Sequence, residues 1–369
     1  MKRILLAITN DISTDNRVHK ISCTLLKSGA NVTVVGRNKP NSIALDKRPY
    51  QTKRFRLLFK KGPCFYMEYN FRLFFYIIFR KFDVIVSNDL DTLLGSYLAS
   101  KIKSGKLVYD SHEYFTEVPE LQERKKIQNI WKSIEKRILP KVKYAYTVSE
   151  SIAFEYQKLY GINMRVVRNL PNFISSHEIL KPAKTETFNI IYQGALNIGR
   201  GLEQLIDSMQ YVENIKLTIF GNGDISKQLQ KQIQDKNLTE KVNLKGRISI
   251  NKLKEETQKA DLGVSLEENL GLNYYYALPN KLFDYIQARV PVLVSPFPEM
   301  QKIITKYKIG TTYEHKNPKA LAKKINEIIK QKEIYQKWEE NTERAAQELC
   351  WENEEKILID IYSKTGLDF

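Results

Sequence analysis

Residues 278–292 read LPNKLFDYIQARVPV and predict a short helix followed by a buried strand. Pro279 suits the first helical turn, where its missing N–H costs nothing. Asn280, Lys281 and Asp284 fall three and four positions apart, so they share one face near the positive end of the helix. An ammonium group, an amide and bare backbone N–H groups at a helix start suit an anion such as a diphosphate. The alternative is an i,i+3 Lys–Asp pair on a solvated face, worth about 0.3 kcal/mol.

A second segment, residues 188–205, reads FNIIYQGALNIGRGLEQL. It predicts an apolar strand that runs into Gly194, a loop that carries Arg200, and then an amphipathic helix. A small residue and a cation in the loop after a strand occupy the usual phosphate position of an open α/β sheet. Another predicted strand, residues 215–220, ends in a glycine-rich turn at Gly221. The two segments in this order favour a phosphate-binding α/β unit.

Strands and helices alternate along the whole chain, which predicts α/β architecture with doubly wound parallel sheets. A second alternating series follows from residue 188 to about residue 331. Residues 175–187 lack periodicity and contain Pro182, so we expect a linker there. In the first half we expect strands at 2–8, 31–36, 83–87, 106–109, 145–148 and 165–167, and helices at 17–28, 66–82, 92–103, 129–139 and 150–160.

The order of these segments resembles the GT-B glycosyltransferases, most closely the large retaining family four, also described as glycosyl transferases group 1. The segments that carry the resemblance are YQGALNIGRGLEQLI, IFGNGD, VNLKGRIS, ADLGVSL and LPNKLFDYIQARVPVLVS in the second half, and TDNRVHKISCTLLKSGANVTVVGR, NDLDTLLGSYLASK, KLVYDSHEYFTE, YTVSESI and VVRNLPNF in the first. The resemblance implies two Rossmann-like domains that face a central cleft. The implied domains are residues 1–178 on the acceptor side, residues 186–345 for the nucleotide-sugar donor, and a helix at 346–369 that returns to the first domain.

The resemblance also implies an activity: a hexosyltransferase-type enzyme that moves a sugar from a nucleotide-sugar to a glycan or lipid-linked acceptor. We expect retention of configuration, no required metal or other cofactor, and a role in cell-surface polysaccharide or glycolipid synthesis. Two alternatives stay open, namely a nucleotide-sugar-binding protein without transferase activity and a GT-B-fold nucleotide-sugar epimerase. Transfer and hydrolysis assays with a panel of nucleotide-sugars would separate the three.

In the second half, the resemblance implies that Arg200 and Lys281 are catalytic cations for the departing diphosphate and that Asp284 holds the ribose. The family often has two glutamates eight residues apart, and the first of these positions is Tyr276 here. Glu267 and Glu268 lie nearby and are candidates to substitute for it. The expected donor-binding residues are Gly194, Gly221, Gly246, Arg247, Asn280 and Asp284.

In the first half, candidate residues follow the predicted strands. His112 is expected to be catalytic, touching the sugar or the acceptor, and its alternative role is to satisfy local backbone groups. The adjacent Glu113 is either an acceptor-side base or a helix N-terminal charge. Arg17 is a candidate for an acceptor phosphate, although Asp15 nearby suits a plain helix cap. Asp91 is interpreted as the cap of the helix that follows it.

The net charge of +17 is concentrated in the first half of the chain. Residues 1–180 hold 31 Lys/Arg against 16 Asp/Glu, and the remainder holds 28 against 26. Basic surfaces attract phosphates on nucleic acid or lipid, and the sequence contains no nucleic-acid-binding motif. Residues 47–61 hold seven Lys/Arg and no acid, with aromatic residues interleaved and following. The predicted membrane-facing residues are Lys53, Arg54, Arg56, Lys60 and Lys61.

These features predict a cytoplasmic protein, peripheral on the inner face of the plasma membrane, with an anionic membrane surface and no nucleic acid among its partners. The alternative for residues 47–61 is a solvated loop before a core helix. The apolar runs at 1–8 and 73–79 are too short for a signal core or for the ~20 residues of a membrane span. Three separated cysteines (Cys23, Cys64 and Cys350) and four scattered histidines suit a reducing compartment and predict no metal site.

Overall fold

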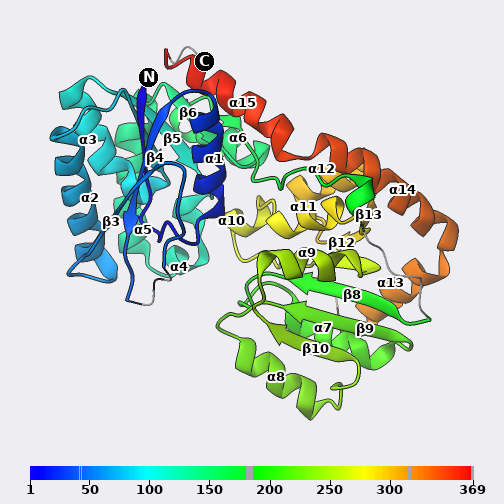
Figure 1. The fold of residues 1–369 in the computed structure, drawn as a ribbon. Coiled ribbons are helices and arrows are strands. Elements are labelled where there is room, and N and C mark those ends of the chain that lie inside the picture. The colour runs from blue at the N-terminus through cyan, green and yellow to red at the C-terminus, as the bar shows by residue number, and fades with distance from the viewer. Residues whose placement is uncertain (41, 43, 180–185, 315–316, 367–369) are drawn as a thin grey trace. The chain divides into compact units, whose positions relative to one another are not determined.

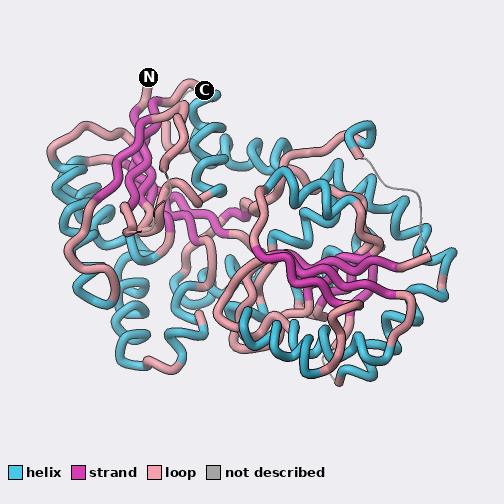
Figure 2. Tube along the Cα trace, turned by 60° about the horizontal axis from the view of Figure 1, so that its bottom comes forward, coloured by secondary structure: helices cyan, strands magenta, loops and turns pink. Residues whose placement is uncertain are grey.

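The computed structural model describes residues 1–40, 42, 44–179, 186–314 and 317–366. The chain divides into two compact units, which are described separately. The first unit comprises Met1–Asn169 and Glu354–Phe369, and the second comprises Leu170–Asn353. Each unit is built around one parallel β-sheet covered by helices (Figure 1, Figure 2).

The sheet of the first unit has seven strands in the order β3-β2-β1-β4-β5-β6-β7, and all neighbours are parallel. Strand β1 is apolar and buried from Ile4 onward, and Ile4 pairs with Val32 of β2 on one side and with Val84 of β4 on the other. Strands buried on both faces are expected where crossover helices cover both sides of a parallel sheet. The strands are β1 (Arg3–Ala7), β2 (Asn31–Arg37), β3 (Gln51–Phe55), β4 (Val84–Asn88), β5 (Lys106–Ser111), β6 (Tyr144–Thr147) and β7 (Arg165–Val166).

Helices of the first unit cover both faces of this sheet. α2 and α3 lie side by side on one face and α1 on the other (Figure 1), as right-handed crossovers from β1 and β3 require. The helices are α1 (Asn16–Lys27), α2 (Gly62–Ile78), α3 (Leu93–Lys103), α4 (Pro119–Gln122), α5 (Lys125–Ile138) and α6 (Glu150–Tyr160). The last helix is α15 (Trp351–Ser363), and its residues from Glu354 onward belong to this unit. The Glu354 carboxylate accepts hydrogen bonds from the backbone N–H and the side chain of Arg168. Asp360 forms an ion pair with Arg165.

The second unit has a six-stranded parallel sheet in the order β10-β9-β8-β11-β12-β13. Apolar clusters fill both of its faces. The strands are β8 (Phe188–Gln193), β9 (Ile215–Phe220), β10 (Val242–Gly246), β11 (Leu262–Ser265), β12 (Val292–Val294) and β13 (Gly310–Thr312). The helices are α7 (Leu202–Ser208), α8 (Ser226–Asp235), α9 (Ile250–Gln258), α10 (Leu272–Tyr275), α11 (Asn280–Gln287), α12 (Pro298–Tyr307), α13 (Pro318–Lys330) and α14 (Lys332–Glu348).

The predicted α/β class with doubly wound parallel sheets is confirmed. The predicted domain boundaries at 178–186 and 345–346 stay predictions. Along the chain, the division between the two compact units falls between Asn169 and Leu170 and between Asn353 and Glu354. Residues 180–185 of the predicted linker lie outside the described residues. Among the residues that the structure describes, no helix is both long enough and apolar enough to span a bilayer.

Three local predictions need correction. Pro279 is the N-cap of α11 and not part of its first turn, because its ψ of 135° keeps it extended. The basic segment 47–61 contains strand β3, which its charges concealed. Asp91 does not cap α3; it lies in a 3₁₀ turn, and its carboxylate accepts a hydrogen bond from Thr9 Oγ1.

Candidate functional site

In the second unit, the point where the strand order reverses lies between β8 and β11. The chain leaves these two neighbouring strands toward opposite edges of the sheet, and open α/β sheets bind ligands outside the carboxyl ends of strands at such a point. Gly194 directly follows β8, and Glu267 lies two residues beyond β11. The topology therefore brings the loops of two distant segments together.

Glu267 is the centre of a buried charge cluster at this point. Its side chain is 0% exposed; Oε1 lies 2.9 Å from Lys281 Nζ and 3.6 Å from Arg200 Nη1. Oε2 accepts a hydrogen bond of 2.8 Å from Ser265 Oγ. Burial by itself would raise the pKa of this carboxyl, but Lys281, Arg200 and Ser265 outweigh burial and lower it. Glu267 is therefore ionised at neutral pH.

Lys281 is held in place by three contacts. Beside its ion pair with Glu267, it donates to Tyr192 Oη at 3.2 Å, and its Nζ lies 4.2 Å from the centroid of that ring. A Cβ atom at Gly194 would lie 3.3 Å from Lys281 Cε, so the glycine leaves room for the lysine stem. Lys281 thus lies buried beside the loop that follows β8.

Arg200 is the second cation of the cluster and carries an unused donor. Its guanidinium carbon lies 4.8 Å from the centroid of the Tyr274 ring. Its Nε is buried and has no hydrogen-bond partner among the described residues. A buried donor without a partner is costly unless a ligand or water satisfies it. Two cations against one carboxylate leave the cluster net positive, which suits an anionic ligand.

Three glycine turns line up beside this cluster. Gly194 N donates to Phe220 O at 3.0 Å, and Gly221 N donates to Gly246 O at 2.9 Å. Gly221 has φ +141°, and a Cβ atom there would lie 1.8 Å from Gly194 O. Only glycine fits such a close approach of two backbones. The carboxyl ends of β8, β9 and β10 therefore form one continuous rim.

Asp284 lies on the same side of the sheet, in contact with the residue that precedes Gly194. Gln193 Nε2 donates to Asp284 Oδ2 at 2.8 Å, and Gln193 Oε1 accepts from Thr257 Oγ1 at 2.7 Å. These three side chains line a pocket of about 60 Å³ whose surface is largely apolar. Its other lining residues are Pro171, Ile174, Ile250, Leu253, Lys254, Gln258, Gln287 and Ala288. The pocket offers a carboxylate and an amide next to apolar surface.

The first unit has its own point of reversal, between β1 and β4, and polar side chains gather beside it. Arg17 Nη2 lies 2.8 Å from Asp110 Oδ1, and Arg17 Nη1 donates to Val167 O at 3.0 Å. His112 Nε2 lies 3.0 Å from Asp110 Oδ2, and its Nδ1 lies 3.4 Å from Asp89 Oδ2. His112 therefore has a carboxylate at each ring nitrogen.

These carboxylates set the charge of His112. Burial alone would lower its pKa, but Asp89 and Asp110 outweigh burial and raise the pKa to about 9. Burial would raise the pKa of Asp110, yet Arg17 and His112 lower it to about 2. Burial raises the pKa of Asp89 to about 7 despite the neighbouring His112. At neutral pH His112 is thus an imidazolium ion.

The structure brings the predicted donor-side residues Gly194, Arg200, Gly221, Gly246, Lys281 and Asp284 to one edge of the second sheet. Asn280 and Arg247 are exposed, at the start of α11 and directly after β10.

On the acceptor side, Arg17 is only 5% exposed and lies in its internal ion pair. Glu113 is half-buried, and its carbonyl oxygen accepts from Ser111 Oγ. Asp15 caps α1 by accepting from Val18 N at 3.0 Å, which confirms the alternative interpretation of that residue. The contacts predicted between Arg17, Glu113 or His112 and a substrate stay predictions.

The predicted membrane-facing residues surround the edge strand β3. Lys53, Arg56, Lys60 and Lys61 are exposed, whereas Arg54 is half-buried with Nη1 3.4 Å from Asp11 Oδ1. Within the described residues, His, Cys, Asp and Glu side chains form no group of three that could hold a metal ion.

The sequence offered Glu267, together with Glu268, only as a candidate to substitute for the acid absent at Tyr276, and did not predict its buried pairing with Lys281 and Arg200. The signal that identifies it is its position beyond the carboxyl end of β11, the same criterion that selects Gly194 and His112. Tyr276 instead ends the short helix α10.

Two family models match the chain in succession. The model described as Glycosyltransferase Family 4 matches residues 15–178, and the model described as Glycosyl transferases group 1 matches residues 177–345. No curated protein matches the sequence.

Solved structures resemble the whole chain. Sucrose-phosphate synthase from Thermosynechococcus elongatus is 17% identical, with 99% of each chain covered and a TM-score of 0.82. Anabaena HepE, solved in complex with UDP-glucose, is 14% identical, with 99% of this chain and 100% of that chain covered and a TM-score of 0.77. WaaG, a glycosyltransferase involved in lipopolysaccharide biosynthesis, is 14% identical, with 97% and 99% covered and a TM-score of 0.73.

Proposed function

Because this chain is a GT-B glycosyltransferase of the group 1, family 4 kind, we propose that it transfers a sugar from a nucleotide-sugar donor to a glycan or lipid-linked acceptor. The second unit would hold the donor. The observation that carries this assignment is the buried cluster of Glu267, Lys281 and Arg200. It is net positive, and Arg200 Nε has no hydrogen-bond partner among the residues that the structure describes. HepE, which resembles this chain in fold, is described in complex with UDP-glucose, which supports a nucleotide-sugar as ligand.

In the proposed reaction, negative charge develops on the diphosphate as its bond to the sugar breaks. Arg200 and Lys281 would stabilise that charge, since fixed cations in a buried site need no reorganisation during the step. Asp284 would accept hydrogen bonds from the ribose hydroxyls, and the side-chain amide of Gln193 would donate to them. We propose that the configuration is retained by a front-face path. The bond between the sugar and the diphosphate breaks, the acceptor oxygen bonds to the same carbon from the same side, and the proton of the acceptor hydroxyl passes to the departing diphosphate oxygen.

We further propose that the acceptor belongs to cell-surface polysaccharide or glycolipid synthesis and that the enzyme is peripheral on the cytoplasmic leaflet of the plasma membrane. WaaG, described as acting in lipopolysaccharide biosynthesis, has the same fold. The exposed Lys53, Arg56, Lys60 and Lys61 suit anionic lipid, at about 1 kcal/mol per basic residue near the surface. No metal or cofactor is proposed, so transfer should persist in EDTA.

The first experiment is a thermal-shift screen with UDP, GDP, CMP and ADP. A nucleotide that binds the folded chain stabilises it by RT ln(1 + [L]/Kd), about 2.7 kcal/mol at a hundredfold excess over Kd. Arg200→Met should abolish the shift, whereas Lys245→Met, which changes an exposed lysine of the same unit, should leave it intact. The proposal fails if none of the four nucleotides stabilises the protein.

Transfer assays with the matching nucleotide-sugars then separate the alternatives. A transferase releases the free nucleotide when the acceptor is added. Binding without turnover of any nucleotide-sugar would indicate a binding protein, and a changed nucleotide-sugar without release of the nucleotide would indicate an epimerase.

A further inference from the structure

Helix α2 carries large apolar side chains on two opposite faces. One face packs against the sheet, and the other is exposed. The buried residues are Phe65, Tyr69, Leu73 and Ile77. The exposed residues, with their exposed fractions, are Met67 (71%), Phe71 (64%), Phe75 (38%) and, at the C-cap, Phe79 (76%). The exposed set repeats every four residues, so it forms one stripe along the helix.

The exposed rings contact one another. The centroids of Phe71 and Phe75 are 4.7 Å apart in an edge-on arrangement, and those of Phe75 and Phe79 are 6.0 Å apart and stacked. A solvated helix face gains nothing from three adjacent phenylalanines, and contiguous exposed apolar patches mark interaction sites.

The neighbouring helix α3 extends this stripe. Leu94, Leu98 and Ile102 are exposed at the same four-residue spacing. α2 and α3 lie side by side (Figure 1), joined where Asn70 Oδ1 accepts from Gly95 N at 2.8 Å. We call the surface formed by Met67, Phe71, Phe75, Phe79, Leu94, Leu98 and Ile102 the α2–α3 face.

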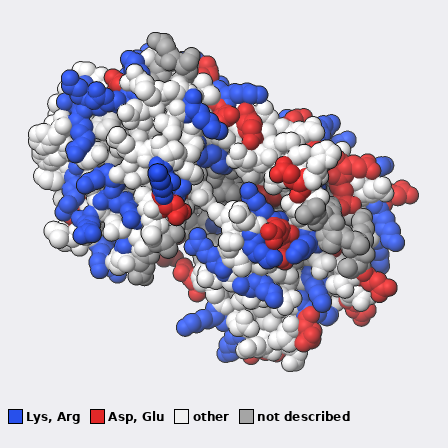
Figure 3. Space-filling view, viewed as in Figure 1, with Lys and Arg blue, Asp and Glu red and all other residues white. Residues whose placement is uncertain are grey.

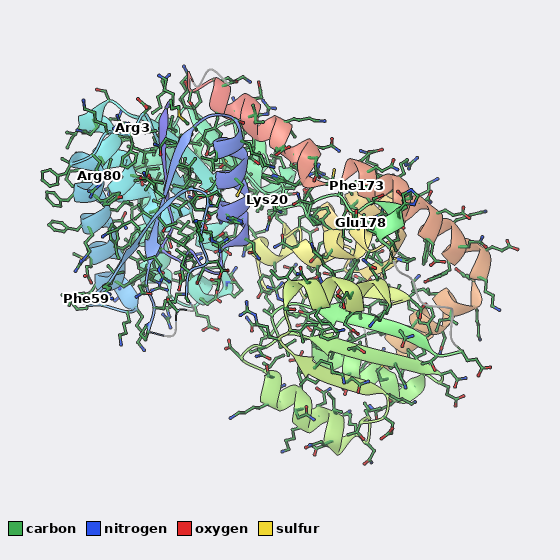
Figure 4. The ribbon with its side chains drawn as sticks, in the orientation of Figure 1. Arg3, Lys20, Phe59, Arg80, Phe173 and Glu178 are labelled. Carbon is green, nitrogen blue, oxygen red and sulfur yellow. The ribbon has the colours of Figure 1, made fainter. Side chains whose placement is uncertain are left out.

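The charges around the α2–α3 face are almost all positive. α3 contains no Asp or Glu, and the one acid of α2, Glu68, pairs with Arg72 and accepts from the backbone N–H groups of Leu58 and Phe59. Figure 3 shows Lys and Arg side chains around uncharged surface on this side of the first unit, and Figure 4 shows Arg80 and Phe59 there. The basic residues on these helices and the segments that flank them are Lys60, Lys61, Arg72, Arg80, Lys81, Lys101 and Lys103.

We infer that the α2–α3 face inserts into the headgroup–acyl boundary of an anionic lipid bilayer. Aromatic and aliphatic side chains bordered by Lys and Arg are the composition of an interfacial membrane-binding surface. A second copy of this chain is the less suitable occupant, because a two-fold contact would bring the same positive border against itself.

This inference rests on the membrane association proposed above, but it assigns the apolar part of the contact to the α2–α3 face and not to residues 47–61. Residues 47–61 would contribute long-range attraction that salt screens, whereas the α2–α3 face would contribute apolar burial that salt does not weaken. Wild-type binding should therefore have a salt-sensitive part and a salt-resistant part.

The test is sedimentation of the full chain with vesicles of 1:1 phosphatidylcholine and phosphatidylglycerol, in low salt and in 0.5 M NaCl. The triple variant Phe71→Ser, Phe75→Ser, Phe79→Ser should lose at least about tenfold in partitioning, and nearly all binding in high salt. The control is Phe154→Ser on α6, a phenylalanine that is 65% exposed elsewhere in the same unit, and it should bind as the wild type does. Wild-type partitioning of the triple variant would overturn the inference.

A second measurement does not depend on the folding of the triple variant. Phe79→Trp and Phe154→Trp each place an indole at an exposed position. With vesicles that contain brominated lipid, fluorescence quenching beyond that of the wild type should occur for Phe79→Trp and not for Phe154→Trp. Equal quenching of the two tryptophan variants would contradict insertion. Insertion would also be contradicted if the wild type is a dimer and the triple variant becomes a monomer without losing vesicle binding.

These outcomes are distinct from failure of the proposed function. Both tryptophan variants should keep the thermal shift with nucleotide, because α2 and α6 belong to the first unit and the nucleotide site is proposed in the second. Loss of quenching with an intact nucleotide shift would overturn the membrane inference alone.

Discussion

The two sheets reverse their strand order in the same way, yet the charge balance at the two points of reversal differs. Beside β1 and β4, the two cations Arg17 and His112 accompany three carboxylates, Asp89, Asp91 and Asp110. Burial raises the pKa of Asp89 and Asp91 to about 7, so both are partly protonated at neutral pH and this cluster is close to neutral. Beside β8 and β11, two cations accompany the single carboxylate Glu267.

This difference indicates what each unit can bind. A cluster whose cations are already paired with carboxylates suits hydroxyl groups, whereas a net positive cluster with an open donor suits a diphosphate. One topology therefore supports two kinds of recognition, and a few residues at the strand ends decide between them.

The largest effect is expected from Lys281→Met. It should remove a cation from the developing charge and lower kcat/KM by about 10²–10³, or roughly 3–4 kcal/mol of transition-state stabilisation. The measurement is steady-state transfer with the donor found by the nucleotide screen. The matched control is Lys245→Met, which changes an exposed lysine of the same unit outside the cluster and the pocket. Wild-type turnover of Lys281→Met would refute the proposal that Lys281 stabilises the charge on the departing diphosphate.

Glu267→Gln tests the same cluster from its centre. Removing the buried carboxylate leaves two cations without a counter-charge, so the free energy of unfolding should fall by about 3 kcal/mol. Nucleotide would then supply the missing negative charge, and its stabilising shift should exceed that of the wild type. Glu268→Gln is the control, since this neighbour is half-buried. A nucleotide shift smaller than that of the wild type would show that Glu267 itself contacts the ligand.

The first unit is tested by the pH dependence of stability. The pKa of His112 is raised from 6.5 in the unfolded chain to about 9 in the fold. Its contribution is therefore fully present below pH 6.5 and is lost as the pH rises through 9, by up to about 3 kcal/mol. Urea unfolding of the wild type and of His112→Gln should differ most near pH 6 and least near pH 9.5. A difference that does not change with pH would contradict the imidazolium assignment.

The smallest effect is expected from Asp284→Ala, which removes one hydrogen-bond acceptor beside Gln193. Nucleotide affinity should fall about tenfold, or roughly 1.4 kcal/mol, measured by calorimetry with the free nucleotide. Thr257→Val removes the other contact of Gln193 and should have a smaller effect. Unchanged affinity in Asp284→Ala would place the ribose elsewhere.

The sequence predicts the strands and the glycine turns of the second unit well, because both follow from local patterns. Gly194, Gly221 and Gly246 are each visible as a turn after an apolar run, and the sheet then brings them side by side. The full surroundings of His112 could not be predicted. Asp110 is only two residues away, but Asp89 and Arg17, which pairs with Asp110, are distant in sequence and meet this segment only through strand order.

The exposed side of α2 was also hidden in the sequence. The buried set that contains Tyr69 and Leu73 and the exposed set that contains Phe71 and Phe75 have the same four-residue spacing and similar apolar character. A helix that is apolar all round predicts complete burial, and only the position of the sheet decides which side is covered.

Strand β3 is an edge of the seven-stranded sheet, because it pairs only with β2 among the described strands. An open strand edge is a template on which a second chain can add its own strand, and charged side chains there prevent such growth. Lys53 and Arg54 lie in this strand and Arg56 directly follows it, so we expect their charges to disfavour the joining of separate molecules into an extended sheet. Replacing them with serine would therefore promote self-assembly, and such variants would collect in the pellet even in tubes that contain no vesicles.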